Sequence, residues 1–307
     1  MSISELRFFD LFLTRDPEKC WFKESPGSCE RTYVPKKDHP ELTEFYGKLV
    51  INAASEFKID WNDIRYRVER RNLAIGETIF VCRRFMVRPN KLSELSFPLA
   101  LANKLLEAET KDGLIIFLGR IGTGKSTVAG TLVKERLSIH GGVAWTIENP
   151  VEADLSGPHG NGICYQTEVM NEDDVGKEIV CTLRSSPNLI YIGEIRKDSA
   201  ALEALHASIS GHLVISTHHG NDVQTGLARL STKAGSPSIL ADALRAAIYL
   251  DLKKISSGQL RLATETLWVS GTSNEDAIRS TLRKGEYHLL SNFIERQKRL
   301  LQEGKEL

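Results

Sequence analysis

The feature that most constrains the fold of this chain is a glycine-rich segment between a short apolar run and a helical pattern. Residues 114–118 are continuously apolar, as in a buried parallel strand, and Gly119 to Ser126 then match the pattern Gly-x4-Gly-Lys-Ser. A turn of this kind exposes backbone N–H groups that surround phosphate oxygens at the start of a helix. The segment therefore predicts a phosphate-binding loop with a nucleoside triphosphate as its ligand.

The polar residues of this loop have separate chemical roles. The ammonium group of Lys125 can reach the β- and γ-phosphates, and the hydroxyl group of Ser126 can ligate Mg²⁺. The sequence therefore predicts Mg²⁺ as a cofactor beside the nucleotide. The predicted nucleotide-binding residues are Gly119, Gly122, Thr123, Gly124, Lys125, Ser126 and Thr127.

Length and composition limit the remaining possibilities. A chain of 307 residues has room for two domains, and its 40 Lys and Arg residues balance 40 Asp and Glu residues. A protein that grips nucleic acid usually carries a basic excess, so we expect no direct nucleic-acid partner. The five cysteines include no Cys-x-x-Cys pair, which disfavours a zinc site and fits a reducing cytosol. No apolar run approaches membrane-spanning length, so we expect a cytoplasmic protein without a transmembrane segment.

The chain divides by pattern into three parts. Residues 1–95 predict a small domain, in which 41–58 have helical spacing and 63–69 and 78–87 alternate as strands. Residues 96–112 predict a linker with a short helix.

From residue 113 to 307, strand and helix patterns alternate, which predicts a parallel sheet covered on both faces. The predicted strands are 113–119, 143–148, 189–194 and 212–217, with a further β-rich segment at 260–269.

Polar residues follow three of these strands where each strand ends. Glu148 and Glu152 follow one strand, Glu194 follows the next, and His218 and His219 follow a third. Ligands of open parallel sheets bind beyond the carboxyl ends of the strands, so we expect these groups to meet the phosphate loop. One carboxylate can hold the water shell of Mg²⁺, another can polarise a water molecule, and a histidine can sense the γ-phosphate. The set predicts a nucleotide hydrolase.

Three further segments resemble motifs of the secretion traffic ATPases. Residues 183–196 resemble their unusual Walker B segment, Leu-Arg-x-x-Pro-x-x-Ile-x-x-Gly-Glu-(Ile/Met)-Arg, which has Glu where most P-loop enzymes have Asp. Residues 146–152 resemble the acidic box, with Asn149 in place of the usual Asp, and residues 211–219 resemble the histidine box. With the phosphate loop, these boxes occur in the family's order. Within the superfamily the chain is most similar to PilT-type pilus retraction ATPases and DotB-type ATPases of type IV secretion and conjugation.

This resemblance implies an α/β fold with a RecA-like P-loop ATPase core at 113–307 and a PAS-like N-terminal domain, joined by a flexible linker. It implies Mg²⁺-dependent hydrolysis of ATP by a homo-hexamer at the cytoplasmic face of the inner membrane. The implied partners are inner-membrane platform or coupling components of a secretion or pilus machine. The C-terminal motif of retraction ATPases is only faintly echoed at 288–296, which favours secretion or conjugation over retraction.

The resemblance also implies roles for individual residues. Lys125 contacts the phosphates, Ser126 and Glu194 hold Mg²⁺, and His219 matches the last histidine of its box. Glu152 matches the residue taken as the water-activating base, and Glu148, nearer the strand, is the alternative. The candidate residues for contacts between subunits are Arg67, Arg83, Arg196, Arg229 and His212.

Three other classes of function stay open from the residues alone. A RecA-like nucleic-acid motor conflicts with the neutral charge and predicts stimulation by single-stranded DNA. A small-molecule kinase leaves the Gly-Glu-Ile-Arg segment and the paired histidines unexplained. A regulatory nucleotide-binding protein leaves both acidic strand ends unexplained.

Overall fold

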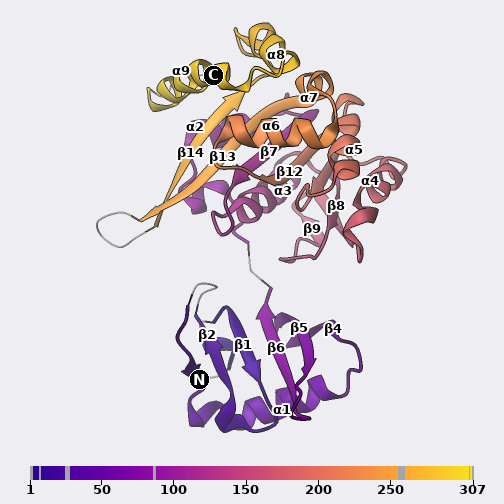
Figure 1. Cartoon of the computed structure of the whole chain (residues 1–307), viewed down its shortest axis with the longest axis vertical. Coiled ribbons are helices and arrows are strands. Elements are labelled where there is room, and N and C mark those ends of the chain that lie inside the picture. Colours follow the sequence, from indigo (N-terminus) through magenta and orange to yellow (C-terminus); the bar gives the residue numbers. More distant parts are fainter. Residues whose placement is uncertain are drawn as a thin grey trace. The chain divides into compact units, whose positions relative to one another are not determined.

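The chain forms two compact units that meet in sequence between Val87 and Arg88 (Figure 1). The computed structural model describes residues 3–6, 8–24, 28–85, 88–254, 260–303 and 305. The sequence pattern predicted a boundary at residue 95 with a separate linker over 96–112. The boundary observed is earlier, and the predicted linker lies within the larger unit.

The smaller unit is a six-stranded antiparallel sheet in the order β3-β2-β1-β6-β5-β4 with helix α1 packed against it. Its core contains Phe45 of α1 together with Tyr66 and Val68 of β5, because alternate residues of that strand face inward. The elements are η1 (Ile3–Glu5), β1 (Asp10–Leu13), η2 (Pro17–Lys19), β2 (Trp21–Lys23), β3 (Thr32–Tyr33), η3 (Lys36–Asp38), α1 (His39–Val50), β4 (Glu56–Trp61), β5 (Ile64–Asn72) and β6 (Thr78–Arg84).

The helix predicted over 41–58 is shorter than its apolar spacing suggested. It ends at Val50, and the side chain of Asn52 accepts a hydrogen bond from the N–H of Ala54 at 3.0 Å as the chain turns. Phe57, included in the helical pattern, lies on β4, where alternate residues are half-buried. The apolar side chain of Phe57 fits both the helical period and the strand period, and its place in the sheet decides in favour of the strand. The strand predicted to end at residue 87 ends at Arg84; residues 86–87 lie outside the described part of the chain.

Residues 88–112 are part of the larger unit's core. Leu92, Phe97 and Leu101 are buried there beside helix α3. The guanidinium group of Arg136 on α3 donates hydrogen bonds to the carbonyl groups of Leu105, Glu107 and Thr110. These contacts explain why the segment does not form a separate linker.

The larger unit is built on an eight-stranded sheet in the order β14-β13-β7-β12-β11-β8-β10-β9. The strands from β13 to β10 in this order run parallel, and β14 and β9 pair antiparallel at the edges. The predicted parallel sheet is confirmed, but β9, β10 and β13 were not predicted. The strands are β7 (Gly113–Gly119), β8 (Gly142–Glu148), β9 (Gly157–His159), β10 (Gly162–Glu168), β11 (Leu189–Ile192), β12 (Leu213–His219), β13 (Leu244–Lys254) and β14 (Leu260–Trp268).

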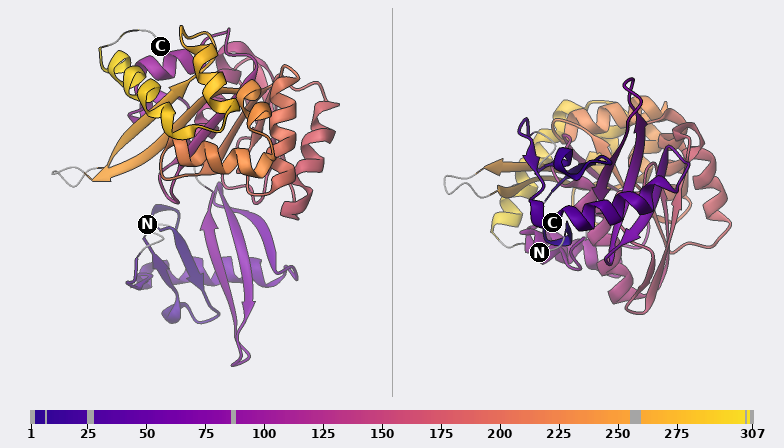
Figure 2. Two further views of the ribbon diagram at one scale, coloured as in Figure 1. Left: turned by 45° about the horizontal axis from the view of Figure 1, so that its top comes forward. Right: turned by 90° about the horizontal axis from the view of Figure 1, so that it is seen from below.

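Helices cover both faces of this sheet (Figures 1 and 2). One apolar core joins α2 and α3 to the sheet, and the other joins helices α4 to α9 to its opposite face. The helices are η4 (Leu92–Leu95), α2 (Leu99–Leu106), α3 (Lys125–His140), η5 (Glu172–Asp174), α4 (Val175–Leu183), α5 (Asp198–Ile209), α6 (Val223–Ala234), α7 (Pro237–Ala243), α8 (Glu275–Arg283), η6 (Tyr287–Leu290) and α9 (Ser291–Gln302). None of the described helices has the length and apolar character needed to cross a bilayer.

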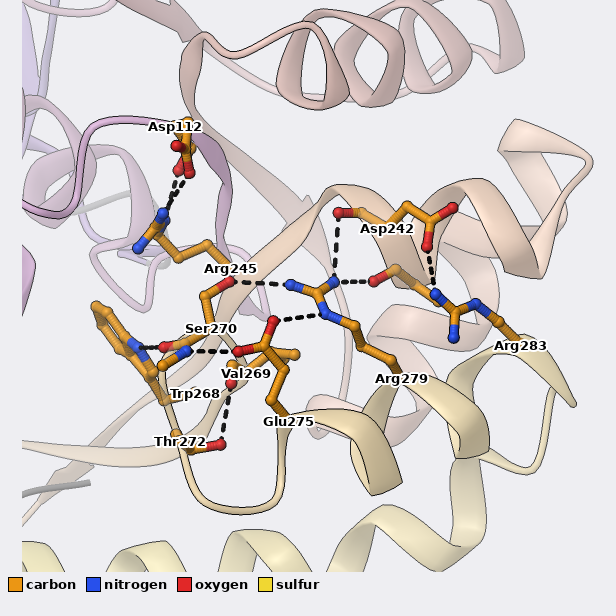
Figure 3. Close-up of polar contacts among 12 residues, drawn as sticks. Asp112, Asp242, Arg245, Trp268, Val269, Ser270, Thr272, Glu275, Arg279 and Arg283 are labelled. Atoms are coloured by element: carbon orange, nitrogen blue, oxygen red, sulfur yellow. Dashed lines mark hydrogen bonds and ion pairs between the residues drawn. The ribbon is translucent and has the colours of Figure 1, made fainter.

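Helix α8 is fastened to its neighbours by one largely buried arginine (Figure 3). The guanidinium group of Arg279 donates hydrogen bonds to Glu275 at 2.8 Å, to Ser270 at 3.1 Å and to the carbonyl group of Ala241. Its side chain is only 16% exposed. Arg279 therefore joins α8 to α7 and to the turn after β14.

Replacing Arg279 by Ala is expected to lower the free energy of local unfolding of α8 by about 2 kcal/mol, because the acceptors lose a charged donor. Hydrogen exchange of the α8 amides measures this local free energy. The matched control is Arg283→Ala on the same helix, since Arg283 pairs with Asp242 while both side chains are 49% exposed. In the control, the free energy of local unfolding of α8 is expected to change by less than about 1 kcal/mol. Equal effects of the two substitutions would contradict this assignment.

Candidate active site

The phosphate loop lies between β7 and α3 and needs glycine at its first position. Gly119 has φ +153°, and a Cβ atom there would lie 2.6 Å from both the carbonyl oxygen of Leu250 and Oγ1 of Thr123. Gly122 and Gly124 have φ of +80° and +87°, the left-handed region that favours glycine. The hydroxyl of Thr123 donates to the carbonyl group of Arg120 at 2.9 Å, which closes the turn internally.

Lys125 begins α3 and turns its ammonium group back over this loop. Its Nζ atom donates hydrogen bonds to the carbonyl groups of Gly119 at 3.0 Å and Arg120 at 2.8 Å. The side chain is buried, and burial lowers the pKa of Lys125 while the carboxylates of Glu194 and Glu152 oppose that shift. The lysine is thus held at the phosphate position with two acidic residues near it.

The register of the parallel strands brings the other predicted residues to the same edge. In the β12–β7 pair, His219 lies opposite Gly119, the first glycine of the loop. In the next two pairs, Ile192 at the end of β11 lies opposite Ser216 of β12 and Ile147 of β8. Neighbouring strands are about 4.8 Å apart. The ends of four strands therefore deliver the loop, the histidine and both acidic segments to one place.

Glu194 is the centre of a charged cluster after β11. Its Oε2 atom accepts a hydrogen bond from Nε of Arg196 at 2.6 Å, and its Oε1 atom lies 2.7 Å from Nε2 of His219. The carboxylate is 17% exposed, and Arg196 also reaches Glu172 at 3.3 Å. His219 therefore contacts the carboxylate that the sequence assigned to Mg²⁺.

Glu148 and Glu152 occupy different environments although they are close in sequence. Glu148 is 2% exposed, and burial raises its pKa, which a hydrogen bond from Gln166 at 2.8 Å and the charge of Arg88 partly offset. Glu152 is exposed, and within the described chain no hydrogen bond or ion pair holds its carboxylate. A water molecule can therefore reach Glu152 more easily than Glu148.

Gln166 is a site residue that the sequence did not reveal. From β10, its amide NH₂ group donates to Glu148 and to the carbonyl group of Ala153, and its oxygen accepts from the N–H groups of Leu155 and Ser156. One side chain thus ties the buried glutamate to the loop that carries Glu152. Recognition of β10 as a strand paired with β8 would have been the only signal.

A cavity of about 570 Å³ adjoins the cluster between α5 and α6. It is lined by Arg196, Arg229 and both histidines that end β12. His218 is buried, and its Nδ1 atom lies 2.7 Å from the carbonyl oxygen of Ile195. Burial lowers the pKa of His218. Arg196 and Arg229 therefore lie near the site, as a residue that connects the site to a neighbouring subunit must.

The other residues predicted to contact a neighbouring subunit are His212, Arg67 and Arg83. His212 precedes β12, so the length of that strand separates it from His219. In the smaller unit, Arg67 pairs with Glu56 at 3.0 Å, and Arg83 binds Asp10 through two hydrogen bonds of 2.7 and 2.9 Å. Both arginines already have partners within their own unit.

The residues predicted to hold Mg²⁺ have suitable chemistry. Mg²⁺ prefers oxygen ligands and commonly takes one or two from the protein, with waters and phosphate oxygens completing its shell. Ser126 is half-buried at the start of α3, and Glu194 offers two carboxylate oxygens, of which Oε1 is buried beside His219. Those residues contain no cluster of three His, Cys, Asp or Glu side chains suited to a metal held by protein alone.

Sequence comparison identifies the family. The family model described as type II/IV secretion system protein matches residues 51–265, which include all the strand ends described above. The chain belongs to this family. The type IV pilus ATPase PilU of Pseudomonas aeruginosa is 31% identical over 242 residues, covering 76% of this chain and 60% of PilU. The type II secretion system protein E of Aeromonas hydrophila is 32% identical over 161 residues, covering 52% of this chain and 31% of that protein.

Solved structures share the fold of this family member. The pilus retraction motor PilT with bound ADP matches with a TM-score of 0.73 at 23% identity, covering 94% of this chain and 86% of PilT. The ATPase DotB of Legionella pneumophila matches with a TM-score of 0.68 at 18% identity, covering 97% of this chain and 85% of DotB. The predicted fold class, an α/β P-loop unit with a smaller N-terminal unit, is confirmed.

Replacing Lys125 by Ala is expected to weaken binding of an ATP analogue about 100-fold, because the phosphates lose a buried charged donor worth about 3 kcal/mol. Titration with a fluorescent analogue measures the dissociation constant. The control is Lys177→Ala, an exposed lysine that pairs with Asp174 away from the loop. Unchanged affinity in the Lys125 variant would show that the nucleotide binds elsewhere.

Proposed function

We propose that this family member hydrolyses ATP with Mg²⁺ and works as a hexameric motor of a type IV secretion, conjugation or pilus machine. The observation that carries the proposal is the shared edge of β7, β12, β11 and β8, where the phosphate loop meets Glu194, His219 and the two acidic-box glutamates. PilU is named a pilus ATPase, and the PilT structure holds ADP. Both names support ATP as the nucleotide.

The chemistry follows from where each side chain lies. The loop N–H groups and Lys125 bind the phosphates and stabilise the charge that develops as the γ-phosphoryl group departs. Ser126 and Glu194 would hold Mg²⁺, which when bound neutralises charge on the phosphate oxygens. Glu152 aligns the attacking water and takes its proton, because it is exposed and unpaired within the described residues. His219 contacts Glu194 and senses the phosphate at the end of β12.

Glu148 supports the base in this scheme. It is buried, and Gln166 connects it to the backbone of residues 153–156 just after Glu152. Through Gln166, the carboxylate of Glu148 therefore fixes the position of the loop that carries Glu152. This division of roles differs from the alternative in which Glu148 itself takes the proton.

Replacing Glu152 by Gln is expected to lower kcat at least about 100-fold while nucleotide affinity stays within a factor of two, because the amide cannot accept the proton. Steady-state phosphate release and analogue titration measure the two quantities. Glu148→Gln keeps the shape of the buried side chain and is expected to lower kcat only about tenfold, a barrier change of about 1.4 kcal/mol. A full loss in Glu148→Gln with normal turnover in Glu152→Gln would move the base to Glu148.

The proposed hexamer has a separate test. If each site requires an arginine from a neighbouring copy, specific ATPase activity rises with protein concentration as the ring assembles. Light scattering with and without a non-hydrolysable analogue measures the mass in parallel. A mass of about six chains with rising specific activity supports the ring. A monomer whose turnover is independent of concentration contradicts it, and stimulation by single-stranded DNA would favour a nucleic-acid motor.

The inner-membrane platform and cytoplasmic location belong to the same proposal. The relatives are named for type II secretion and type IV pili, so a machine of that class is the proposed partner. The chain spans 60% of PilU and about a third of the type II relative. The relatives therefore do not decide which machine this chain drives; the proteins that bind the chain itself would.

A further inference from the structure

A buried arginine stands where the chain enters the larger unit. Arg88 is the first residue of that unit, directly after the last residue of the smaller one, and it is only 3% exposed. Its Nε and Nη1 atoms are buried and have no hydrogen-bond acceptor among the described residues. Buried guanidinium groups are costly unless a negative charge compensates them. A compensating anion is therefore required nearby.

Helix α3 is shaped to receive this side chain. A Cβ atom on Gly130 would lie 2.0 Å from Nη1, 2.6 Å from Cζ and 2.7 Å from Cδ of Arg88. Glycine in a helix interior is unfavourable relative to alanine, so its presence here fits a packing requirement. Position 130 lies within the first turns of α3, close to the phosphate loop. The guanidinium group thus occupies space that any other residue at position 130 would fill.

Two hydrogen bonds also fasten the same segment to α3. The Nζ atom of Lys134, one turn beyond Gly130, donates to the carbonyl group of Arg88 at 3.2 Å. The carboxylate of Glu135 accepts a hydrogen bond from the N–H of Leu92 at 2.8 Å. The connecting segment, residues 88–92, is therefore held along the helix that follows the phosphate loop.

Glu148 is the buried carboxylate on which the charge of Arg88 acts. The charge of Arg88 acts to lower the pKa of Glu148, against the effect of burial, and it acts in the same direction on Tyr191 of β11. Thr146, Glu148 and Tyr191 belong to the adjacent strands β8 and β11, where Tyr191 lies opposite Thr146. The hydroxyl groups of Tyr191 and Thr146 are also buried beside these charges. Arg88 is thus the cation of a polar cluster beneath the acidic box.

We propose that Arg88 is a positioning residue that holds Glu148 and, through Gln166, the loop bearing Glu152, so that the segment joining the two units sets the hydrolysis rate. The inference rests on the proposed ATPase function. The charge of the buried Arg88 acts on the carboxylate of Glu148 across the polar cluster. Glu148 accepts a hydrogen bond from the amide of Gln166 at 2.8 Å, and Gln166 is hydrogen-bonded to the backbone of residues 153–156. Displacement of the segment would shift the base without touching the nucleotide.

The first test compares turnover with nucleotide affinity in the full chain. Arg88→Ala is expected to lower kcat about tenfold while the dissociation constant of an ATP analogue stays within a factor of two. Arg88→Lys is expected to recover part of the loss because it keeps the charge. Arg283→Ala removes an exposed arginine of α8, which packs on the opposite face of the sheet from α3, and is expected to keep wild-type kcat. Wild-type turnover in Arg88→Ala, or an equal loss in Arg283→Ala, would overturn the proposal.

The second test needs no catalysis and uses the melting temperature. Gly130→Ala is expected to lower the melting temperature in the wild-type background, because its Cβ displaces Arg88. In the Arg88→Ala background the space is free, so the same substitution is expected to raise it, as alanine favours helix. Arg88→Ala is also expected to lower the melting temperature less in Glu148→Gln, where no buried charge is left uncompensated.

The two tests separate the possible failures. A wild-type chain that releases no phosphate from ATP refutes the proposed function and with it the control of hydrolysis by Arg88. An active wild type whose Arg88→Ala variant keeps full kcat refutes only the inference. If Gly130→Ala raises the melting temperature in both backgrounds, or if Glu148→Gln leaves the cost of Arg88→Ala unchanged, the placement of Arg88 against α3 and Glu148 is wrong.

Discussion

The parallel register between β7, β12, β11 and β8 is the constraint on which the rest of the site depends. Backbone hydrogen bonds fix His219 opposite Gly119 and place the ends of β11 and β8 beside them. A shift of one residue in any pair would turn alternate side chains to the other face of the sheet. The apolar residues of these strands are buried on both faces, so such a shift would also exchange side chains between two cores that are each packed for a different set. Packing of the core therefore fixes the geometry of the chemistry at its edge.

Charge compensation explains how an acidic site and a phosphate-binding loop share this edge. The ammonium group of Lys125 donates hydrogen bonds to two loop carbonyl groups, and Glu194 is paired with Arg196 and lies beside His219. These contacts offset part of the cost of burying the charges. Phosphate oxygens are stronger acceptors for Lys125 than carbonyl groups, because a hydrogen bond between two charged groups is stronger than one to a neutral acceptor. Binding of nucleotide can therefore replace the internal contacts without rebuilding the sheet.

The sequence predicted those parts of the site that depend on local pattern. Strand β7 was predicted with its observed bounds, and the residues after β8, β11 and β12 were placed at one edge because parallel strands end there. Gln166 and Arg88 were missed because their roles depend on pairing between segments that are far apart in the chain. The domain boundary was misplaced for a related reason. Residues 88–112 have few long apolar runs, and only their contacts with α3 show that they belong to the larger unit.

Helix α3 contacts two functional segments at once, the phosphate loop and the segment at residues 88–92. Its first residue, Lys125, closes the phosphate loop, and its next turns carry Gly130, Lys134 and Glu135, which hold the segment that follows the smaller unit. A helix is stiff over this length, so a displacement of that segment along α3 is not absorbed locally. Under the proposed role of Arg88, it reaches the polar cluster of Arg88 and Glu148, where each buried charge is costly alone. The geometry of the acidic box then depends on the segment at residues 88–92 through the charge of Arg88.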